Sequence, residues 1–339
     1  MDSLLPISKF IDYLLARLEE NYEKTGLSIS DDLTSWGNTL RLRLAGTKEM
    51  QLFLKEKVFY LSSDEFPIHL FLHRHVMKSG VPVAPLLTTK SGAISFKVCK
   101  REFEVQQWLQ GDSCRIEQPA YILSLGHTFG VFHCAASHFR LDQMQNWSFP
   151  SARRRWFPDH WELICSYLDF LQSLHTNQRS ILTQLRDIRE QLVYWEEIIE
   201  WDKLPKQWLH GDASPDNAIW QGSAHCYLLD FDDARWGYKS WEVAQMVTVL
   251  GIVERNKENG LTEIRKNWDS EKMAQFLSGY LEVNRLTDSE LRAFASLLAL
   301  NCLIVGISEI GFDEEQIGRS DLIEQFEHIT VLIKSIPEF

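Results

Sequence analysis

The order of apolar and polar positions divides the chain into a strand-rich first part and a helical remainder. Residues 1–25 carry apolar positions at helical spacing with acidic residues between them, which predicts an N-terminal helix. Residues 39–46 and 50–61 alternate apolar and polar side chains with the period of a strand on either side of the turn signal AGTKE, so a hairpin is expected. Two further strands are expected in residues 93–109.

One helix is expected within this first part. Its apolar residues recur at helical spacing, at Ile68, Leu72 and Val76, and the pattern ends at Gly80 before the rigid segment VPVAP. The same segment carries three histidines, His69, His73 and His75. No carboxylate motif lies near them, so we predict a partly exposed helix face and not a metal site.

From about residue 118 the pattern becomes that of long helices. The expected helices are residues 120–139, 160–175, 181–201 and 242–254, with more helix toward the C-terminus. A single short strand-like piece, residues 225–233, is expected to interrupt them. The sequence therefore predicts a small sheet with one helix, followed by a larger and mainly helical part.

Composition and charge limit the classes of function. With 339 residues, 45% of them hydrophobic, the chain can fill one large domain or two lobes. We find no run of about 18 apolar residues and no secretory leader, so we expect a cytoplasmic protein without a membrane partner.

The net charge of −12 is unevenly distributed. Residues 1–110 carry 14 Lys and Arg against 13 Asp and Glu, so the excess of acid lies beyond residue 110. This argues against nucleic acid as a partner, because phosphate contacts need a basic face. An acidic second half would attract a cationic small molecule, although solubility alone explains it equally well.

Three polar residues in the second part form a constellation with a chemical meaning. The segment WLHGDASPDNAIW places Asp212 five residues before Asn217, and Asp230 ends the strand-like piece that follows. Hard oxygen ligands such as an amide and a carboxylate hold Mg²⁺, while a free carboxylate can accept the proton of an attacking hydroxyl. The pattern favours phosphoryl transfer, with Asp212 as the base and Asn217 and Asp230 as the metal ligands.

The motif HGDxxxxN at residues 210–217, followed by LLDFDD at 228–233, resembles the aminoglycoside phosphotransferase and choline kinase-like superfamily. The resemblance implies a protein-kinase-like bilobal α+β fold, with a small N-terminal antiparallel sheet lobe and a larger, mainly helical C-terminal lobe. The expected division is an N-terminal helix at 1–25, a nucleotide-binding lobe at 26–110 and a catalytic and substrate-binding lobe at 111–339. The implied cofactors are ATP or GTP with Mg²⁺.

The resemblance also implies a nucleotide site in the first lobe. SWGNTLRLRL, residues 35–44, is similar to the family's phosphate-covering hairpin, with Gly37 and Asn38 at its turn. Lys55 is expected to reach the α and β phosphates. The inter-lobe linker is expected to offer its backbone to the adenine at Gln106, Gln107 and Trp108.

The chain departs from the family where a helix-borne glutamate should pair with the nucleotide lysine. His69 stands at that place, and Glu65, one helical turn earlier, is the expected substitute. In the second lobe, the resemblance implies that His210 braces the catalytic loop. Asp232 is expected to lie next to the metal.

The acceptor of the phosphate is less constrained by these motifs. An amine-bearing alcohol such as an aminoglycoside, an amino sugar or a choline-like molecule suits the acidic second half. A homoserine kinase-like metabolite kinase and a stress-response type Ser/Thr protein kinase remain alternatives, as does a pseudo-kinase that binds nucleotide without turnover. Only residues 231–242 separate Asp230 from the next helix, which is short for docking a peptide and favours a small acceptor.

Overall fold

The fold was analysed in a computed structural model of the chain. The structure describes residues 7–22, 26–32, 40–46, 51–57, 68–99, 101–113, 116–140, 168–169, 172–173, 179–222, 225–255, 262–311 and 322–336.

The first part of the chain forms a five-stranded antiparallel sheet. Its strands are β1 (Ser28–Asp32), β2 (Arg41–Ala45), β3 (Gln51–Glu56), β4 (Phe96–Val98) and β5 (Arg101–Gln107), in the order β1-β2-β3-β5-β4. The predicted hairpin and the two further strands are confirmed. Strand β1 was not predicted, because its sequence SISDD has a single large apolar residue and lies at the edge of the sheet.

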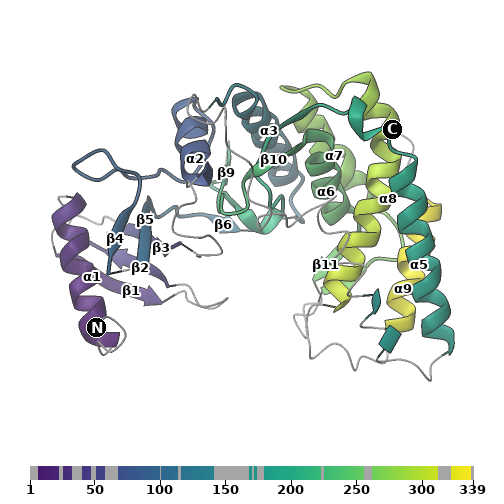
Figure 1. Ribbon diagram of the computed structural model, residues 1–339. Coiled ribbons are helices and arrows are strands. Elements are labelled where there is room, and N and C mark those ends of the chain that lie inside the picture. The colour runs from purple at the N-terminus through teal and green to yellow at the C-terminus, as the bar shows by residue number, and fades with distance from the viewer. Residues whose placement is uncertain are drawn as a thin grey trace.

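Helix α1 (Ile7–Tyr22) covers one face of this sheet (Figure 1). Alternation along the strands turns Leu52 and Leu54 of β3 toward α1, where Leu14 and Leu18 of the helix are fully buried against the sheet. The intervening residues of β3, Phe53 and Lys55, therefore point to the opposite face. That face borders the rest of the molecule.

Helix α2 (Ile68–Lys78) follows the sheet in the chain but belongs to the larger core. Its apolar residues Ile68, Leu72 and Val76 are buried in the same cluster as those of helix α3 (Pro119–Ala136), and the two helices lie side by side. The expectation of a partly exposed histidine face is wrong, because His69 and His73 are both buried.

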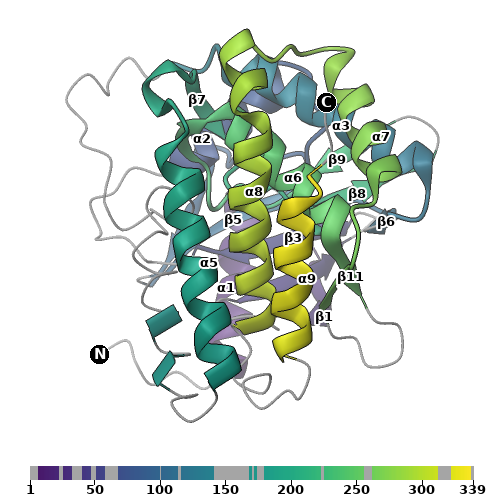
Figure 2. The same ribbon diagram turned by 90° about the vertical axis from the view of Figure 1, so that its right-hand side faces the viewer.

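The second part is mainly helical, as expected. Its further helices are α5 (Arg179–Glu197), α6 (Lys239–Ile252), α7 (Ser270–Leu281), α8 (Asp288–Gly311) and α9 (Leu322–Lys334). The sheet with α1 lies at one end of the molecule and α5, α8 and α9 at the other, with α2, α3, α6 and α7 between them (Figure 1). Helices α5, α8 and α9 stand side by side (Figure 2). This is the bilobal α+β fold expected from the sequence.

Helix α8 is long and apolar enough to span a membrane by length and composition. Its stretch Asp288–Ile307 has a mean hydropathy of 1.7, and 72% of the most apolar window is buried inside the protein. That burial is typical of the core helix of a globular protein. Most of the helix predicted at residues 160–175 lies outside the described residues, although 168–169 and 172–173 are helical.

The expectation of a single strand-like interruption in this part is wrong. Strand β9 (Cys226–Leu228) occupies the predicted place, but it pairs with β8 (Ala218–Trp220), which pairs in turn with β6 (Asp112–Ser113). Two further pairs join β7 (Lys206–Leu209) to β10 (Arg235–Tyr238) and β11 (Val253–Arg255) to β12 (Thr262–Ile264). Most of these strands have three or four residues, too few to show a period in the sequence.

Helices α3 and α7 approach each other through two glycines. A Cβ atom at Gly279 would meet the Leu123 carbonyl oxygen well inside van der Waals contact, and one at Gly126 would do the same with the Phe276 carbonyl oxygen. The helices therefore pack so closely that only glycine fits at these two positions. This contact also positions His133 of α3 and Tyr280 of α7, two buried polar residues that are hydrogen-bonded to each other.

We predict that Gly279→Ala lowers the free energy of unfolding by about 3 kcal/mol, since a methyl group forced into a packed core displaces backbone. Chemical denaturation measures the change. Ser278→Ala, at the exposed neighbouring position of α7, is the control and should stay within about 0.5 kcal/mol of the parent. Equal stability of the two variants would contradict the close helix contact.

Candidate active site

The segment that carries Asp212 and Asn217 links two short strands. It leaves β7 at Leu209, runs through His210–Ser214, forms a single turn of 3₁₀ helix at Pro215–Asn217 and enters β8. The side chain of Ser214 caps that turn by accepting from the amide of Asp216 at 3.3 Å. Asn217 Nδ2 donates to both the backbone oxygen (2.9 Å) and Oδ2 (2.7 Å) of Asp212. The predicted acid and amide are thus in direct contact.

The β8-β9 hairpin brings the second acid to the same place. Leu229, just before Asp230, donates its amide to the Asn217 carbonyl at 2.9 Å, and its own carbonyl accepts from His210 Nε2 at 2.6 Å. Asp230 has a φ of +54°, a left-handed backbone that is uncommon for a non-glycine residue. Such conformations cluster where the surrounding structure holds a functional side chain in a fixed direction.

A buried carboxylate on α6 holds the start of the candidate catalytic loop, residues 210–217. Glu242, 1% exposed, accepts the backbone amides of His210 (3.1 Å) and Gly211 (2.6 Å) and the side chain of His133 (2.8 Å). Burial alone would raise the pKa of Glu242, but the hydrogen bond from His133 and the amide of Gly211 lower that pKa below its usual value. His133 is in turn bound by the hydroxyl of Tyr280, at 2.8 Å. Every donor around this carboxylate therefore favours its charged form.

Gly211 is required where it stands. Its φ is +90°, and a Cβ atom would collide with the backbone oxygen of Asp233. The glycine lets the loop pass directly against the segment that carries the second acid. The Gly in the HGD motif thus has a steric reason that spacing alone does not reveal.

Lys55 from β3 meets the acids of the second lobe. Its Nζ lies 2.6 Å from Asp230 Oδ1 and 2.7 Å from Asp232 Oδ2, and the residue is only 2% exposed. Burial opposes the charge of Lys55, but Asp232 and Asp230 raise its pKa above the ordinary value. The pKa of Asp232 would be raised by burial, and Lys55 and Lys57 hold it well below its usual range. Lys55 and Asp232 are therefore both charged at neutral pH.

A second layer of charges surrounds this cluster. Lys57 forms an ion pair with Glu104 and lies 3.4 Å from Asp232 Oδ1. Glu104 also accepts from Gln106 Nε2 at 2.8 Å, and Arg41 of β2 lies 3.7 Å from Asp230 Oδ2. The sequence predicted Lys55, Asp230 and Asp232 as site residues. It did not predict Arg41, Lys57 or Glu104, because these lie in or next to strands whose pairing only the fold supplies.

A cleft of about 260 Å³ lies next to this cluster, between the sheet and the second lobe. It is lined by Arg41, Phe53, Lys55, Ala84, Gln106, Gln107, Trp108, Leu109, Asp216, Asn217, Ile219, Leu229 and Asp230. Six of the predicted site residues thus share one cavity. Asp212 is next to it through Asn217. Gly37, Asn38 and Glu65 lie outside the described residues, so their roles stay predictions.

Two linker residues that line the cleft use their backbone amides within the protein. The amide of Gln107 donates to the Pro85 carbonyl at 2.8 Å, and the amide of Trp108 donates to the Gln51 carbonyl at 3.0 Å. These two donors are therefore already used. Leu109 lines the cleft as well, and no hydrogen bond among the described residues uses its amide. The sequence reading did not include it.

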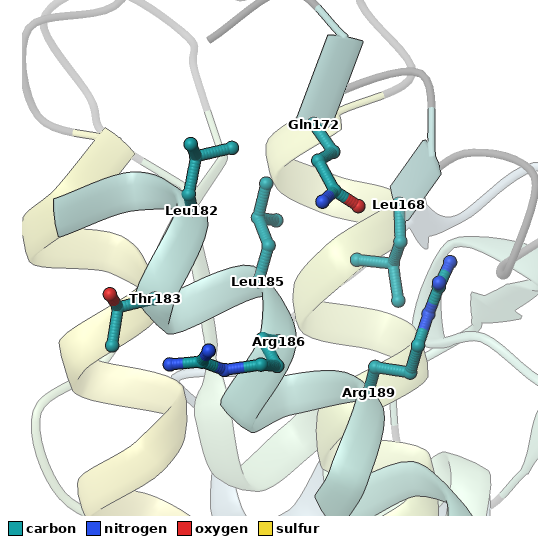
Figure 3. Close-up of a pocket in the computed structure, with 7 residues that line it drawn as sticks. All are labelled: Leu168, Gln172, Leu182, Thr183, Leu185, Arg186 and Arg189. Carbon is teal, nitrogen blue, oxygen red and sulfur yellow. The ribbon is translucent and has the colours of Figure 1, made fainter. Parts of the chain in front are cut away.

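A larger cavity, of about 460 Å³, lies on the second lobe. It is formed by α5 and residues 168 and 172, with leucines on its walls and Arg186 and Arg189 at its edge (Figure 3). Arg189 is paired with Asp169 at 2.6 Å. None of the predicted site residues lines this cavity, so its size does not make it the reaction site.

His73 supports the segment of the second acid from beneath. Its ring stacks on Phe231, with centroids 4.6 Å apart and planes 16° apart, and Nε2 donates to the Ala84 carbonyl at 2.7 Å. Burial lowers the pKa of His73 to about 4. The imidazole is therefore neutral at physiological pH, although the sequence placed it on a partly exposed face.

Comparisons with known proteins agree with this architecture. The model of the family described as "Phosphotransferase enzyme family" matches residues 49–283. A homoserine kinase from Parvibaculum lavamentivorans is 24% identical over 195 residues, which are 55% of this chain and 52% of that protein. The chain thus matches about half the length of that relative.

Solved structures share the whole fold. An aminoglycoside phosphotransferase from Alicyclobacillus acidocaldarius superposes with a TM-score of 0.63 at 18% identity, covering 99% of this chain and 96% of that one. An amicoumacin kinase, solved with AMP-PNP, Ca²⁺ and Ami, gives a TM-score of 0.63 at 15% identity, covering 96% and 94%. At these identities the likeness establishes the kinase-like fold.

The environment of His73 predicts a pH dependence of stability. Its pKa is about 4 in the folded protein, against about 6.5 for an ordinary histidine, so the unfolded chain takes up the proton first as the pH falls. Stability is then lost between pH 6.5 and pH 4, by roughly 3 kcal/mol from this group. His73→Gln keeps a donor for the Ala84 carbonyl but does not titrate. Urea unfolding across this range should show a shallower pH slope for the variant, and equal slopes would contradict the assignment.

Proposed function

The chain belongs to the phosphotransferase enzyme family, and from that premise we propose that it is a kinase that transfers the γ-phosphate of ATP or GTP to a hydroxyl group of a small, amine-bearing molecule. The observation that carries the proposal is that two pairs of bonded polar side chains lie together at one cleft. Asp212 is bound to Asn217, and Lys55 is bound to Asp230. These are the groups that phosphoryl transfer needs for proton acceptance, metal binding and phosphate neutralisation.

Asp212 is the proposed base. Its Oδ2 accepts from Asn217, while no hydrogen bond among the described residues occupies Oδ1. The residue is only partly buried, so an acceptor hydroxyl can approach it. The Asn217 bond fixes the carboxylate in one direction, and Oδ1 is left to orient the hydroxyl and to take up its proton as the bond to phosphorus forms.

Asn217 and Asp230 are the proposed holders of Mg²⁺. Both bonds of the Asn217 amide group use Nδ2, which leaves its Oδ1 as a neutral oxygen ligand, and Asp230 adds a carboxylate on the same cleft. An amide and a carboxylate oxygen are the hard ligands that Mg²⁺ prefers. When bound, the ion neutralises phosphate charge. The amicoumacin kinase with AMP-PNP and Ca²⁺ supports a nucleotide and a divalent ion in this fold.

The remaining cleft residues suit a nucleotide. Lys55 and Arg41 provide two cations at the end where the acids lie, and Phe53, Leu109 and Ile219 provide apolar walls for a base. The amide of Leu109 is the proposed donor to that base, next to the predicted linker residues. The cleft thus combines charged and apolar lining residues, as a nucleotide site requires.

Two observations support an amine-bearing acceptor. The acidic excess of the chain lies beyond residue 110, in the lobe that carries Asp212, and a negative lobe favours a cationic alcohol. The relatives named above are a homoserine kinase and an aminoglycoside phosphotransferase. Homoserine and aminoglycosides differ in size, yet each combines a hydroxyl group with a protonated amine.

The proposal is tested by measuring transfer of the γ-phosphate from the nucleotide to an acceptor hydroxyl. Purified protein with Mg²⁺ and ATP or GTP is incubated with homoserine, choline, an amino sugar or an aminoglycoside, and the release of ADP or GDP is followed. We expect turnover that depends on one amine-bearing alcohol. Asp212→Asn should lower kcat by about 10²- to 10⁴-fold, the usual contribution of a positioned base, with nucleotide Kd within about threefold.

Asp202→Asn is the matched control, because it makes the same change at an exposed residue ten positions earlier. It should leave kcat unchanged. Activity of Asp212→Asn within a few-fold of the parent would remove Asp212 from the role of base. Phosphorylation of a peptide and of no small alcohol would replace the proposed acceptor class by a protein hydroxyl.

A further inference from the structure

Lys55 is held by two carboxylates of the same loop. Asp230 Oδ1 and Asp232 Oδ2 lie 2.6 and 2.7 Å from its Nζ, and the lysine is 2% exposed. A buried ammonium group that loses its counter-ion is strongly destabilised. The number of carboxylates available to Lys55 therefore matters for any step that draws one of them away.

The proposed function removes one of these two carboxylates from Lys55, because it assigns Asp230 to the metal. Lys55 would then depend on its other partner. Helix α2, which lies behind the cluster, offers none, since its sequence IHLFLHRHVMK contains no Asp or Glu. The residue of α2 that acts on Asp232 is His69, one helical turn from the His73 ring that stacks on Phe231.

Asp232 is anchored independently of Asp230. Its Oδ1 lies 3.4 Å from Lys57 Nζ, and Lys57 is itself paired with the buried Glu104 of β5. With Asp230 turned to the metal, two lysines and two carboxylates remain, and their charges cancel. Without Asp232, two buried lysines would share Glu104 alone.

We propose that Asp232 is a positioning residue that holds Lys55 in the nucleotide site when Asp230 binds the metal, in the place that a helix-borne acid would otherwise fill. The inference rests on the proposed function for the assignment of Asp230. It offers a partner for Lys55 other than the expected Glu65, and a role for Asp232 other than lying next to the metal.

The test is the affinity for AMP-PNP, measured by calorimetry with Mg²⁺ and with EDTA. Asp230 is free to hold Lys55 in EDTA, so Asp232→Asn should weaken binding by less than about threefold there. In Mg²⁺ the same variant should bind at least about tenfold more weakly than the parent. A loss of general structure would weaken binding equally in both conditions, so the difference between them reports the positioning role.

Rescue by a new carboxylate sharpens the test. His69 of α2 acts electrostatically on Asp232, so His69→Glu combined with Asp232→Asn should recover most of the Mg²⁺-dependent affinity. Asp233→Asn, the same change one residue later, is the control and should show equal ratios in Mg²⁺ and EDTA. Thermal melts of each variant confirm that it is folded.

Two outcomes would overturn the proposal. The first is an Asp232→Asn variant that binds AMP-PNP like the parent in Mg²⁺. The second is a Glu65→Gln variant that shows the Mg²⁺-dependent loss while Asp232→Asn does not, which would return the role to Glu65. Failure of the proposed function is seen separately, as absence of AMP-PNP binding or of turnover in the parent protein.

Discussion

The arrangement of the candidate site depends on one buried carboxylate, that of Glu242. It accepts two successive backbone amides, from His210 and Gly211, at the point where the chain leaves β7. An uncompensated carboxylate at this depth would be costly, and the bond from His133, itself bound by Tyr280, completes its shell. Helices α3, α6 and α7 are thereby tied to the start of the catalytic loop. The loop is fixed by the core of the large lobe and not by its own short strands.

Backbone hydrogen bonds connect this fixed start of the loop to the candidate residues Asn217 and Asp230. His210 binds the Leu229 carbonyl, and the Leu229 amide binds the Asn217 carbonyl. The loop and the segment of the second acid are therefore held together immediately before Asp230. The closeness of the two segments also explains the glycine at 211 and the left-handed backbone at 230. Distances between acid and amide are set by these main-chain contacts.

Two buried lysines connect the small lobe to this framework by charge. Lys55 and Lys57 extend from β3 and its end to acids of the second lobe and of β5, and they are nearly fully buried. Ion pairs of this kind stabilise little by themselves, because desolvation offsets attraction, but they specify which groups must meet. A charged ligand that enters the cleft competes for the same partners. A nucleotide and a metal ion bound in the cleft, as proposed, would therefore be coupled to the contact between the lobes.

Helix α2 shows why the two lobes do not follow the order of the chain. It lies between strands of the small sheet in sequence, yet its apolar residues belong to the core of the large lobe. Its residues His69 and His73 are buried in that interior, and His73 packs against Phe231, which lies between Asp230 and Asp232 in the chain. A period of 3.6 identifies the helix, but it does not reveal which neighbour covers each face.

The sequence by itself determined the elements with a long period and the motifs with a fixed spacing. The hairpin, the long helices and the set Asp212, Asn217 and Asp230 could be read in this way, since hydrophobic period and local chemistry act over a few residues. What could not be read were the short strands of the large lobe, the acid Glu242, the ion pair of Lys57 with Glu104 and the contact of Asp232 with Lys55. Lys55 and Asp232 are 177 residues apart in the chain, and only tertiary packing, which buries charges where their counter-ions are present, decides that they meet.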